Sequence, residues 1–299
     1  MASGAARALF YSGRSPDLCQ SKPKPMSEET CVLVCGIGET ASAVAKRLFA
    51  EERAVAIHQA APPRTLRRKM AFSDAWFDGA ASLEGVEARR ADLSSEFLLG
   101  LRARQFIPVL TQRFADVAER WPWDVIVAAH TEDDSPSEYV KSHADLTIGL
   151  GGDFIAGVDC DIVIETRGPD PGAILRSGRA PGRRQSMSDD SRADRYDVFA
   201  PSSGLFQATK IIGAFVEAGE ALGTVGENAV HAPVSGRIRG VVRKGQAVAT
   251  GSAIAEIVIS NSTRVAGVSH RNQLISRGVA FAVEMEVGGW VPAPFEEWR

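Results

Sequence analysis

A glycine-rich turn follows the first apolar run of the sequence. Residues 35–41 read CGIGETA and fit Gly-x-Gly-x-x-Gly/Ala, a pattern in which a strand leads through a tight turn into a helix. The first glycine makes the turn, the second lets the backbone approach a phosphate, and the small last residue allows close packing of helix on strand. The N-terminus of the helix attracts an anion. We therefore expect Gly36, Gly38 and Thr40 to contact a phosphate.

The end of the second predicted strand carries cations where an NAD site would carry an acid. Residues 57–60 read IHQA, and Arg64, Arg67, Arg68 and Lys69 follow. Guanidinium groups suit a phosphorylated ribose or another polyphosphate better than free ribose hydroxyls. We expect Arg64, Arg67 and Arg68 to neutralise a phosphorylated ligand. The alternative, a Rossmann-like domain used only as a scaffold, stays open.

A second glycine-rich loop lies between two later strands. Four glycines within residues 149–157 let backbone amides approach a ligand closely, and two aspartates could bind a hydroxyl or a cation. The alternative is a glycine-rich turn with acidic caps. The residues expected to bind ligand here are Gly149, Gly151, Gly152, Asp153 and Asp159.

Other polar residues give weaker signals. His130 precedes an acidic run at 132–134, which favours a solvated loop start or a helix cap over a metal site. His58 and His143 have no partner at ligand spacing. The sequence contains no Gly-x-Ser-x-Gly elbow, Walker lysine or His-Glu-x-x-His motif. No catalytic nucleophile or base is identified, no metal is expected, and the sequence leaves open whether the protein is an enzyme.

Short apolar runs that alternate with amphipathic stretches must position these residues. The predicted strands are Cys31–Cys35, Val55–His58, Val86–Arg89, Ile107–Leu110, Asp124–Ala129, Leu146–Gly149 and Asp161–Glu165. The predicted helices are Ala41–Ala50, Ser95–Arg104, Arg113–Arg120 and, near the end of the chain, Arg271–Val287. Strands that are apolar on both faces favour a mostly parallel sheet covered by helices on both sides. We predict a Rossmann-like α/β domain over residues 29–175.

An internal repeat follows this domain. Residues 200–204, APSSG, recur 32 residues later as APVSG at 232–236, and the glycines and apolar positions between keep the same offset. Each unit is too short to bury its apolar face alone, so the two must pack together. The pattern resembles the biotinyl/lipoyl-type barrel-sandwich fold. The stretch joining the units, GENA at 226–229, lacks the lysine that this fold modifies, so we expect no biotin or lipoate attachment and a structural or docking role.

Composition and cysteine content restrict the class of protein to which the chain can belong. The chain has 299 residues, 44% hydrophobic and 24% charged, with a formal net charge of −3, which is typical of a globular protein without a nucleic-acid footprint. No apolar run approaches the ~20 residues of a membrane span. Four irregularly spaced cysteines indicate buried thiols in a reducing cytoplasm. Residues 1–28 have no secretory h-region and are interpreted as a flexible leader, with Met1 and Met26 as alternative starts.

The domain boundaries follow from these observations. Residues 176–197 are polar and lack periodicity, so we interpret them as a linker or mobile loop. The two-repeat β-module is expected over residues 198–260. Residues 261–299 are predicted to form a C-terminal helix and tail that pack back on the core.

The segment 67–79, RRKMAFSDAWFDG, resembles a stretch of the YqeB-type proteins of selenium-dependent molybdenum hydroxylase maturation. Further motifs of that family occur here in the same order, at 107–109 (IPV), 149–159, 163–168 (VIETRG) and in the 32-residue repeat. The resemblance runs from about Cys31 to Val287. The family's basic segment after the fifth strand is replaced by residues 128–134, AAHTEDD, which indicates a diverged member.

The resemblance implies a cytoplasmic accessory protein in the maturation of a molybdenum hydroxylase. By analogy it would bind a phosphorylated nucleotide or a molybdopterin-type cofactor through the residues given above, with the hydroxylase as its client and no nucleic acid or membrane as partner. Assembly into a homo-oligomer stays open. An NADP-dependent oxidoreductase is one alternative. A non-enzymatic scaffold that docks a partner through the β-module is the other.

Overall fold

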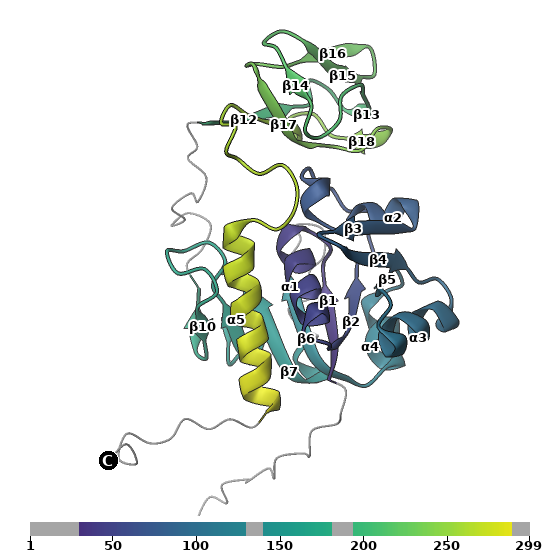
Figure 1. Ribbon diagram of the computed structural model, residues 1–299, viewed down its shortest axis with the longest axis vertical. Helices are drawn as coiled ribbons and strands as arrows, with labels where there is room; N and C mark the ends of the chain where they lie inside the picture. Colours follow the sequence, from purple (N-terminus) through teal and green to yellow (C-terminus); the bar gives the residue numbers. More distant parts are fainter. Residues whose placement is uncertain (1–29, 130–139, 181–193, 289–299) are drawn as a thin grey trace, which may run out of the picture.

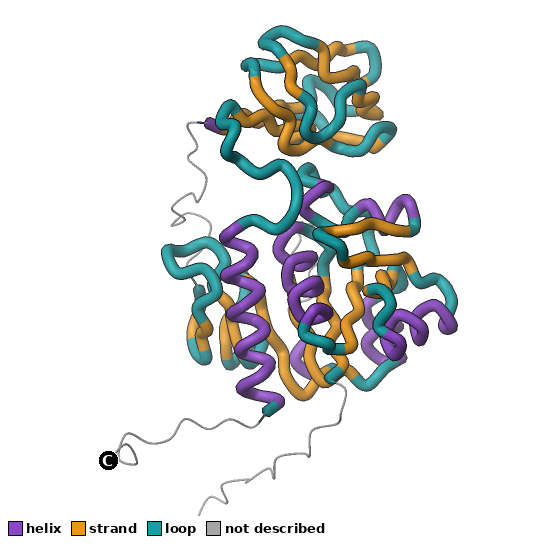
Figure 2. The backbone as a smooth tube through the Cα atoms, viewed as in Figure 1, coloured by secondary structure: helices purple, strands orange, loops and turns teal. Residues whose placement is uncertain are grey.

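The computed structural model describes residues 30–129, 140–180 and 194–288 (Figure 1). A nine-stranded sheet with helices on both faces forms one part of the molecule, and a smaller unit of strands and loops forms the other (Figure 2). The predicted leader, the acidic run after His130 and the end of the predicted tail lie outside the described residues. Among the described helices, none is long and apolar enough to cross a membrane.

The order of strands in the large sheet is β10-β9-β7-β6-β1-β2-β5-β4-β3. Its strands are β1 (Cys31–Cys35), β2 (Ala54–His58), β3 (Ala80–Leu83), β4 (Val86–Arg90), β5 (Ile107–Leu110), β6 (Trp123–Ala129), β7 (Ala144–Leu150), β9 (Ile162–Ile164) and β10 (Ile174–Leu175). From β9 to β4 every neighbouring pair is parallel, whereas the two edge strands β3 and β10 pair antiparallel. The prediction of an α/β fold with a mostly parallel sheet is therefore confirmed.

The strand order reverses at β1. The chain runs from β1 outward through β2 and β5 on one side, then crosses to β6 on the other side and continues through β7 and β9. Open α/β sheets bind ligands at such a reversal, beyond the carboxyl ends of the strands. The Gly36–Gly38 turn leaves β1 at this point.

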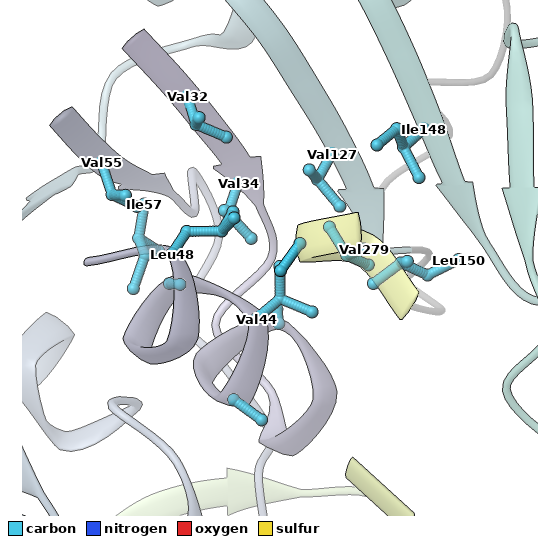
Figure 3. Packing of buried hydrophobic residues seen from close by; sticks show 14 of the residues in the cluster. Val32, Val34, Val44, Leu48, Val55, Ile57, Val127, Ile148, Leu150 and Val279 are labelled. Carbon is cyan, nitrogen blue, oxygen red and sulfur yellow. The ribbon is translucent and has the colours of Figure 1, made fainter. Parts of the chain in front are cut away.

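Each face of the sheet has its own apolar layer. One face packs against α1 (Glu39–Ala50) and α5 (His270–Val287), and Figure 3 shows Val44 and Leu48 of α1 and Val279 of α5 over the valines of β1, β2 and β6. The other face packs against α3 (Ser94–Ala103) and α4 (Phe114–Arg120). The C-terminal helix thus returns from the β-module to the sheet and lies beside α1 (Figure 1).

The β-module consists of two four-stranded sheets around a shared apolar cluster. One sheet has the order β12-β19-β17-β14 and the other β16-β15-β13-β18. Their bounds are β12 (Arg195–Phe199), β13 (Gly204–Ala208), β14 (Phe215–Val216), β15 (Ala221–Val225), β16 (Asn228–His231), β17 (Gly236–Val241), β18 (Gln246–Val248) and β19 (Ala253–Val258). Strands related by the 32-residue offset, such as β13 and β17 or β15 and β19, lie in different sheets. Each sheet therefore contains strands from both repeats.

Backbone hydrogen bonds follow the same repeat. The amide of Gly213 donates to Ile238 O at 2.7 Å, and that of Gly245 donates to Phe206 O at 2.7 Å. Gly213 and Gly245 have φ of +94° and +81°, values that favour glycine. The recurring glycines therefore make equivalent turns, as the sequence predicts.

Most of the predicted linker at 176–197 lies outside the described residues, and its two described ends pair with neighbouring strands. On one side, the short strand β11 (Gly178–Arg179) pairs with β8 (Ile155–Ala156) and belongs to the α/β part. On the other, β12 begins at Arg195 and pairs with β19. The two residues of β11 are too few to show a periodic pattern, so only its pairing with β8 defines it.

Candidate functional site

The turn after β1 depends on Gly36. Its φ is +112°, and a Cβ at this position would lie 3.2 Å from both Cβ and O of Ala129 in β6. Its amide donates to His58 O at 2.8 Å, which ties the turn to the end of β2. Gly36 is thus required for close contact of three strand ends, as the motif predicts for its first glycine.

Gly38 is open to its surroundings. It is the N-cap of α1 with φ of −68°, and a Cβ added there would meet nothing within 4 Å. No side chain in the described part of the chain caps this end of α1. The N–H groups of the first turn of a helix have no partner within the helix, so they are available to an anionic ligand.

Thr40 links two helix N-termini. Its hydroxyl donates to Asn272 Oδ1 at 3.1 Å, and Asn272 is the buried third residue of α5, whose amide donates to the Ser269 hydroxyl at the N-cap. The positive ends of α1 and α5 therefore lie side by side at the carboxyl edge of the sheet. Arg271 in the same turn of α5 donates to Thr166 O at 2.6 Å, beyond the end of β9.

Arg67 lies at the junction between the two parts. Its guanidinium donates to both carboxylate oxygens of Glu256 in β19, at 2.9–3.1 Å, and at 3.4 Å to Glu39 Oε2 in the first turn of α1. Glu256 is 1% exposed and also pairs with Arg195 and Arg239. Three guanidinium groups thus surround one buried carboxylate, which keeps that charge paired.

The negative charge of Glu39 is less completely balanced by neighbouring cations than that of Glu256. Burial raises the pKa of this carboxyl above its ordinary value, the charges of Arg67 and Arg239 partly oppose the rise, and Glu256 adds to it. The Glu39 carboxylate therefore binds a proton more readily than a solvated glutamate.

The rest of the predicted basic cluster fastens the module. Arg68 donates to the carboxylate of Asp74 at 2.8–2.9 Å and to Val241 O at 3.1 Å, and Lys69 donates to Ile212 O at 2.9 Å. Arg64 is exposed. Arg67 reaches the first turn of α1, after β1, through its hydrogen bond to Glu39.

Much of the second predicted loop is folded on itself. A Cβ at Gly149 would lie 2.4 Å from Cγ of the buried Phe154, so this glycine makes room for the core. Asp159 accepts from the Ile155 amide at 2.8 Å and closes a local turn. These contacts match the turn alternative better than a ligand role for Gly149 and Asp159.

The remaining residues of that loop differ in their placement. Gly151 has φ of +97° and packs against the Thr166 hydroxyl, which brings it near the α5 end of the carboxyl edge. Gly152 is half-buried and Asp153 exposed, with no described contact that brings either to the α1 turn. The structure thus gathers Gly36, Gly38, Thr40 and Arg67.

Sequence reasoning missed the charges that face the turn from the module. Glu256 interrupts the apolar strand β19, and Arg239 lies in β17 together with Arg237. Glu256 and Arg239 both break the repeat, because the residues 32 positions earlier are the uncharged Thr224 and Gln207. Comparing the two repeats for charges that occur in only one of them would have included both residues, together with Arg237. Glu39 stands inside the motif itself, between Gly38 and Thr40, at a position to which the motif assigns no role.

The described residues offer little that could bind a metal ion or enclose a small molecule. No group of three or more His, Cys, Asp or Glu side chains there could hold a metal ion. A small pocket of about 10 Å³ lies between α3, α4 and the start of β6, beside Phe97, Trp121 and Trp123. That volume holds about one water molecule.

Comparisons with known proteins give one extended relative. The chain is 32% identical over 289 residues to the uncharacterized protein YqeB of Escherichia coli (strain K12), an alignment that covers 94% of this chain and 52% of that protein. The chain thus spans about half the length of this relative. The similarity supports the predicted YqeB-type family. No protein-family model matches the chain.

Solved structures give weaker similarities. A succinylglutamate desuccinylase/aspartoacylase of Rhodobacter sphaeroides is 18% identical, with a TM-score of 0.22 over 47% of this chain and 60% of that one. An aspartoacylase family protein of Mesorhizobium loti is 12% identical, with a TM-score of 0.25 over 78% and 87%. The product-bound ectoine utilization protein EutE (DoeB) of Ruegeria pomeroyi is 17% identical, with a TM-score of 0.24 over 78% and 86%.

Proposed function

We propose that this chain, with its similarity to YqeB, is an accessory protein in the maturation of a molybdenum-containing hydroxylase and binds a phosphorylated nucleotide or pterin-type cofactor at the turn after β1. The observation that carries the binding site is the N-terminus of α1 at Gly38, where the strand order reverses. No side chain of the described residues caps this helix end, and a Cβ at Gly38 would meet nothing within 4 Å. The phosphate would contact the first-turn amides of α1. The maturation role comes from the family resemblance, and the cytoplasm would be the site of action.

The chemistry of this role is binding and release. Gly36 holds the turn open, the amides of Gly38, Glu39 and Thr40 face the phosphate, and Arg67 supplies a nearby positive charge. No step of bond making or breaking is required of the chain.

A scaffold that docks a partner is the second candidate, and one observation favours it. The basic residues Arg67, Arg68 and Lys69 fasten the β-module to the α/β part, so their charge does not by itself indicate a ligand. We infer further that the module has a barrel-sandwich-type arrangement, supported by its two sheets of interleaved repeats. Under this candidate the module would dock the client without a small molecule.

Calorimetric titration with ATP, NADP and a molybdopterin-type phosphate tests the proposal. The decisive variant is Gly38→Ala, because its methyl group lies where the phosphate would approach and meets no protein atom within 4 Å. We expect one ligand to bind the wild type and to lose at least about tenfold in affinity in the variant, a change of about 1.4 kcal/mol. Leu93→Ala, at the N-cap of α3, is the matched control and leaves binding unchanged.

Two results would contradict parts of the proposal. Absence of binding to all three ligands would favour the scaffold candidate. A ligand that binds wild type and Gly38→Ala equally would occupy another place. The maturation role is tested separately by incubating an apo molybdenum hydroxylase with cofactor and either protein, since only the wild type should accelerate the gain of hydroxylase activity.

A further inference from the structure

Glu39 is the acidic residue of the first turn of α1 and lies beside the proposed phosphate position. An acid in the first turn of a helix normally gains from the helix dipole when it is ionised. Here the carboxylate is turned toward the junction with the module, where its side chain is 23% exposed. Its hydrogen bond from Arg67 measures 3.4 Å, whereas the bonds that Arg67 donates to Glu256 measure 2.9–3.1 Å.

The charged groups that face Glu39 come from two elements of the module and from the segment before η1 (Arg68–Met70). Arg67 and Arg239 stabilise the ionised carboxyl, and Glu256 opposes it. The hydrogen bond between the first turns of α1 and α5, from Thr40 to Asn272, is neutral. Because Arg67 and Arg239 both also serve Glu256, Glu39 shares its positive partners with a second carboxylate.

We propose that Glu39 makes phosphate binding at this site depend on a proton: the ligand binds more tightly when the Glu39 carboxyl is neutral, and binding draws a proton from solvent onto that carboxyl. The inference rests on the proposed function. A phosphate at the amides of Glu39 and Thr40 places negative charge at the same helical turn as the Glu39 carboxylate, and neighbouring like charges repel more strongly in a partly buried site than in water. Protonation removes the repulsion and leaves Arg67 to the phosphate and Glu256. The raised pKa of Glu39 agrees with this geometry.

The test compares wild type with Glu39→Gln, which keeps the size of the side chain and removes its charge. ATP is titrated into both proteins between about pH 5.5 and 8.5, in two buffers of different ionisation enthalpy, so that proton uptake is measured directly. The ratio of the two affinities at each pH cancels the ionisation of ATP itself. Glu51→Gln, at the other end of α1 and paired with Arg47, is the control.

We expect Glu39→Gln to bind ATP roughly tenfold more tightly than wild type at the alkaline end and about equally at the acid end, with greater proton uptake in wild type than in the variant, since the protons exchanged by ATP itself are common to both. Glu51→Gln should follow wild type throughout. Equal affinities of wild type and Glu39→Gln at every pH would overturn this inference and leave the proposed site standing. Absence of binding to every phosphorylated ligand would overturn the proposed function and this inference together.

Discussion

The guanidinium of Arg67 and the carboxylate of Glu256 lie 189 residues apart in the sequence and share three hydrogen bonds of 2.9–3.1 Å. The pair joins the loop after β2 to the β19 strand of the module, next to the backbone bond from Val241 N to Leu66 O at 3.0 Å. An arginine that the sequence assigns to a ligand is therefore a structural contact between the two parts. This placement determines how substitutions at the site must be interpreted.

Arg67→Ala should destabilise the protein by roughly 2–4 kcal/mol, because it removes a partner from a carboxylate that is 1% exposed. Arg195 and Arg239 still contact Glu256 and keep the loss below that of a fully orphaned charge. Denaturant unfolding measures the change. The double variant Arg67→Ala/Glu256→Gln should recover part of it, and additive losses would contradict the coupling. Loss of ligand binding in Arg67→Ala alone therefore cannot identify a ligand contact, which is why Gly38 is the better position.

Gly240→Val should separate the module from the α/β part. A Cβ at Gly240 would lie 3.0 Å from Leu66 Cβ and 3.1 Å from its carbonyl carbon, so the larger side chain displaces the loop that docks there. We expect a loss of about 1–3 kcal/mol and an increased radius of gyration by small-angle X-ray scattering. Ala247→Val, at an exposed position of β18, is the control. An unchanged radius in Gly240→Val would show that the contact does not hold the parts together.

Local pattern predicts the central strands well. The bounds of β1 and β5 agree with prediction, and β2, β4, β6 and α1 differ by one or two residues. Strands β1, β2, β5 and β6 carry apolar runs and α1 an apolar face, which are local signals of burial. The edge strand β3 was missed. It has only one buried residue, Leu83, and it forms because it pairs with β4 across the turn at Glu84.

The residues of the candidate site likewise fall into those that the sequence predicts and those that it does not. Gly36 and Gly38 can be predicted from the sequence, because the strand-turn-helix motif spans only a few residues and its glycines are required by the turn itself. The partners Glu256 of Arg67 and Val241 of Arg68 cannot be predicted in this way, because they come from strands more than 170 residues away. A run of cations has the same local appearance whether it binds a phosphate or a distant carboxylate.

Gly149→Ala should lower the thermal midpoint, in contrast to Gly38→Ala. The new methyl group would lie 2.4 Å from Phe154 Cγ, and Phe154 is 1% exposed. Overpacking of this kind costs typically about 1–3 kcal/mol, whereas the N-cap substitution at Gly38 costs under about 1 kcal/mol. Differential scanning calorimetry of both variants checks the contrast. Equal midpoints would show that Phe154 can move aside and that Gly149 has no packing role.

Glu84 should make stability depend on pH. Its carboxylate accepts from Lys46 Nζ at 2.8 Å and from the Val268 amide at 2.9 Å, and these bonds lower its pKa below the ordinary value of 4.5. The contribution is therefore present above the ordinary pKa and lost as the pH falls through the lowered one. With a side chain 34% exposed and screened by solvent, Glu84→Gln should cost about 0.5–1 kcal/mol at neutral pH.

Denaturation curves across the acid range measure this dependence. The difference between wild type and Glu84→Gln should shrink toward zero below the lowered pKa, and high salt should reduce it at neutral pH. The comparison variant is Glu87→Gln, whose carboxylate is paired with Arg89 two residues along the same strand and has a lowered pKa as well. Since that pair is exposed and joins no separate elements, Glu87→Gln should change stability little. A pH-independent cost for Glu84→Gln would assign it to packing.

Cys160 should resist thiol reagents in the folded protein. Burial raises the pKa of its thiol to about 11, and its side chain is 0% exposed and donates to Ile162 O at 3.2 Å. Near pH 8 the thiolate fraction is then roughly one part in a thousand, and the thiolate is the reactive form. Alkylation with iodoacetamide followed by peptide mass spectrometry should label Cys160 only after denaturation, with the half-buried Cys31 labelled earlier. Labelling of Cys160 at the same rate in native and denatured protein would mean that β9 and the preceding turn open readily, because no reagent reaches the thiol while they stay closed.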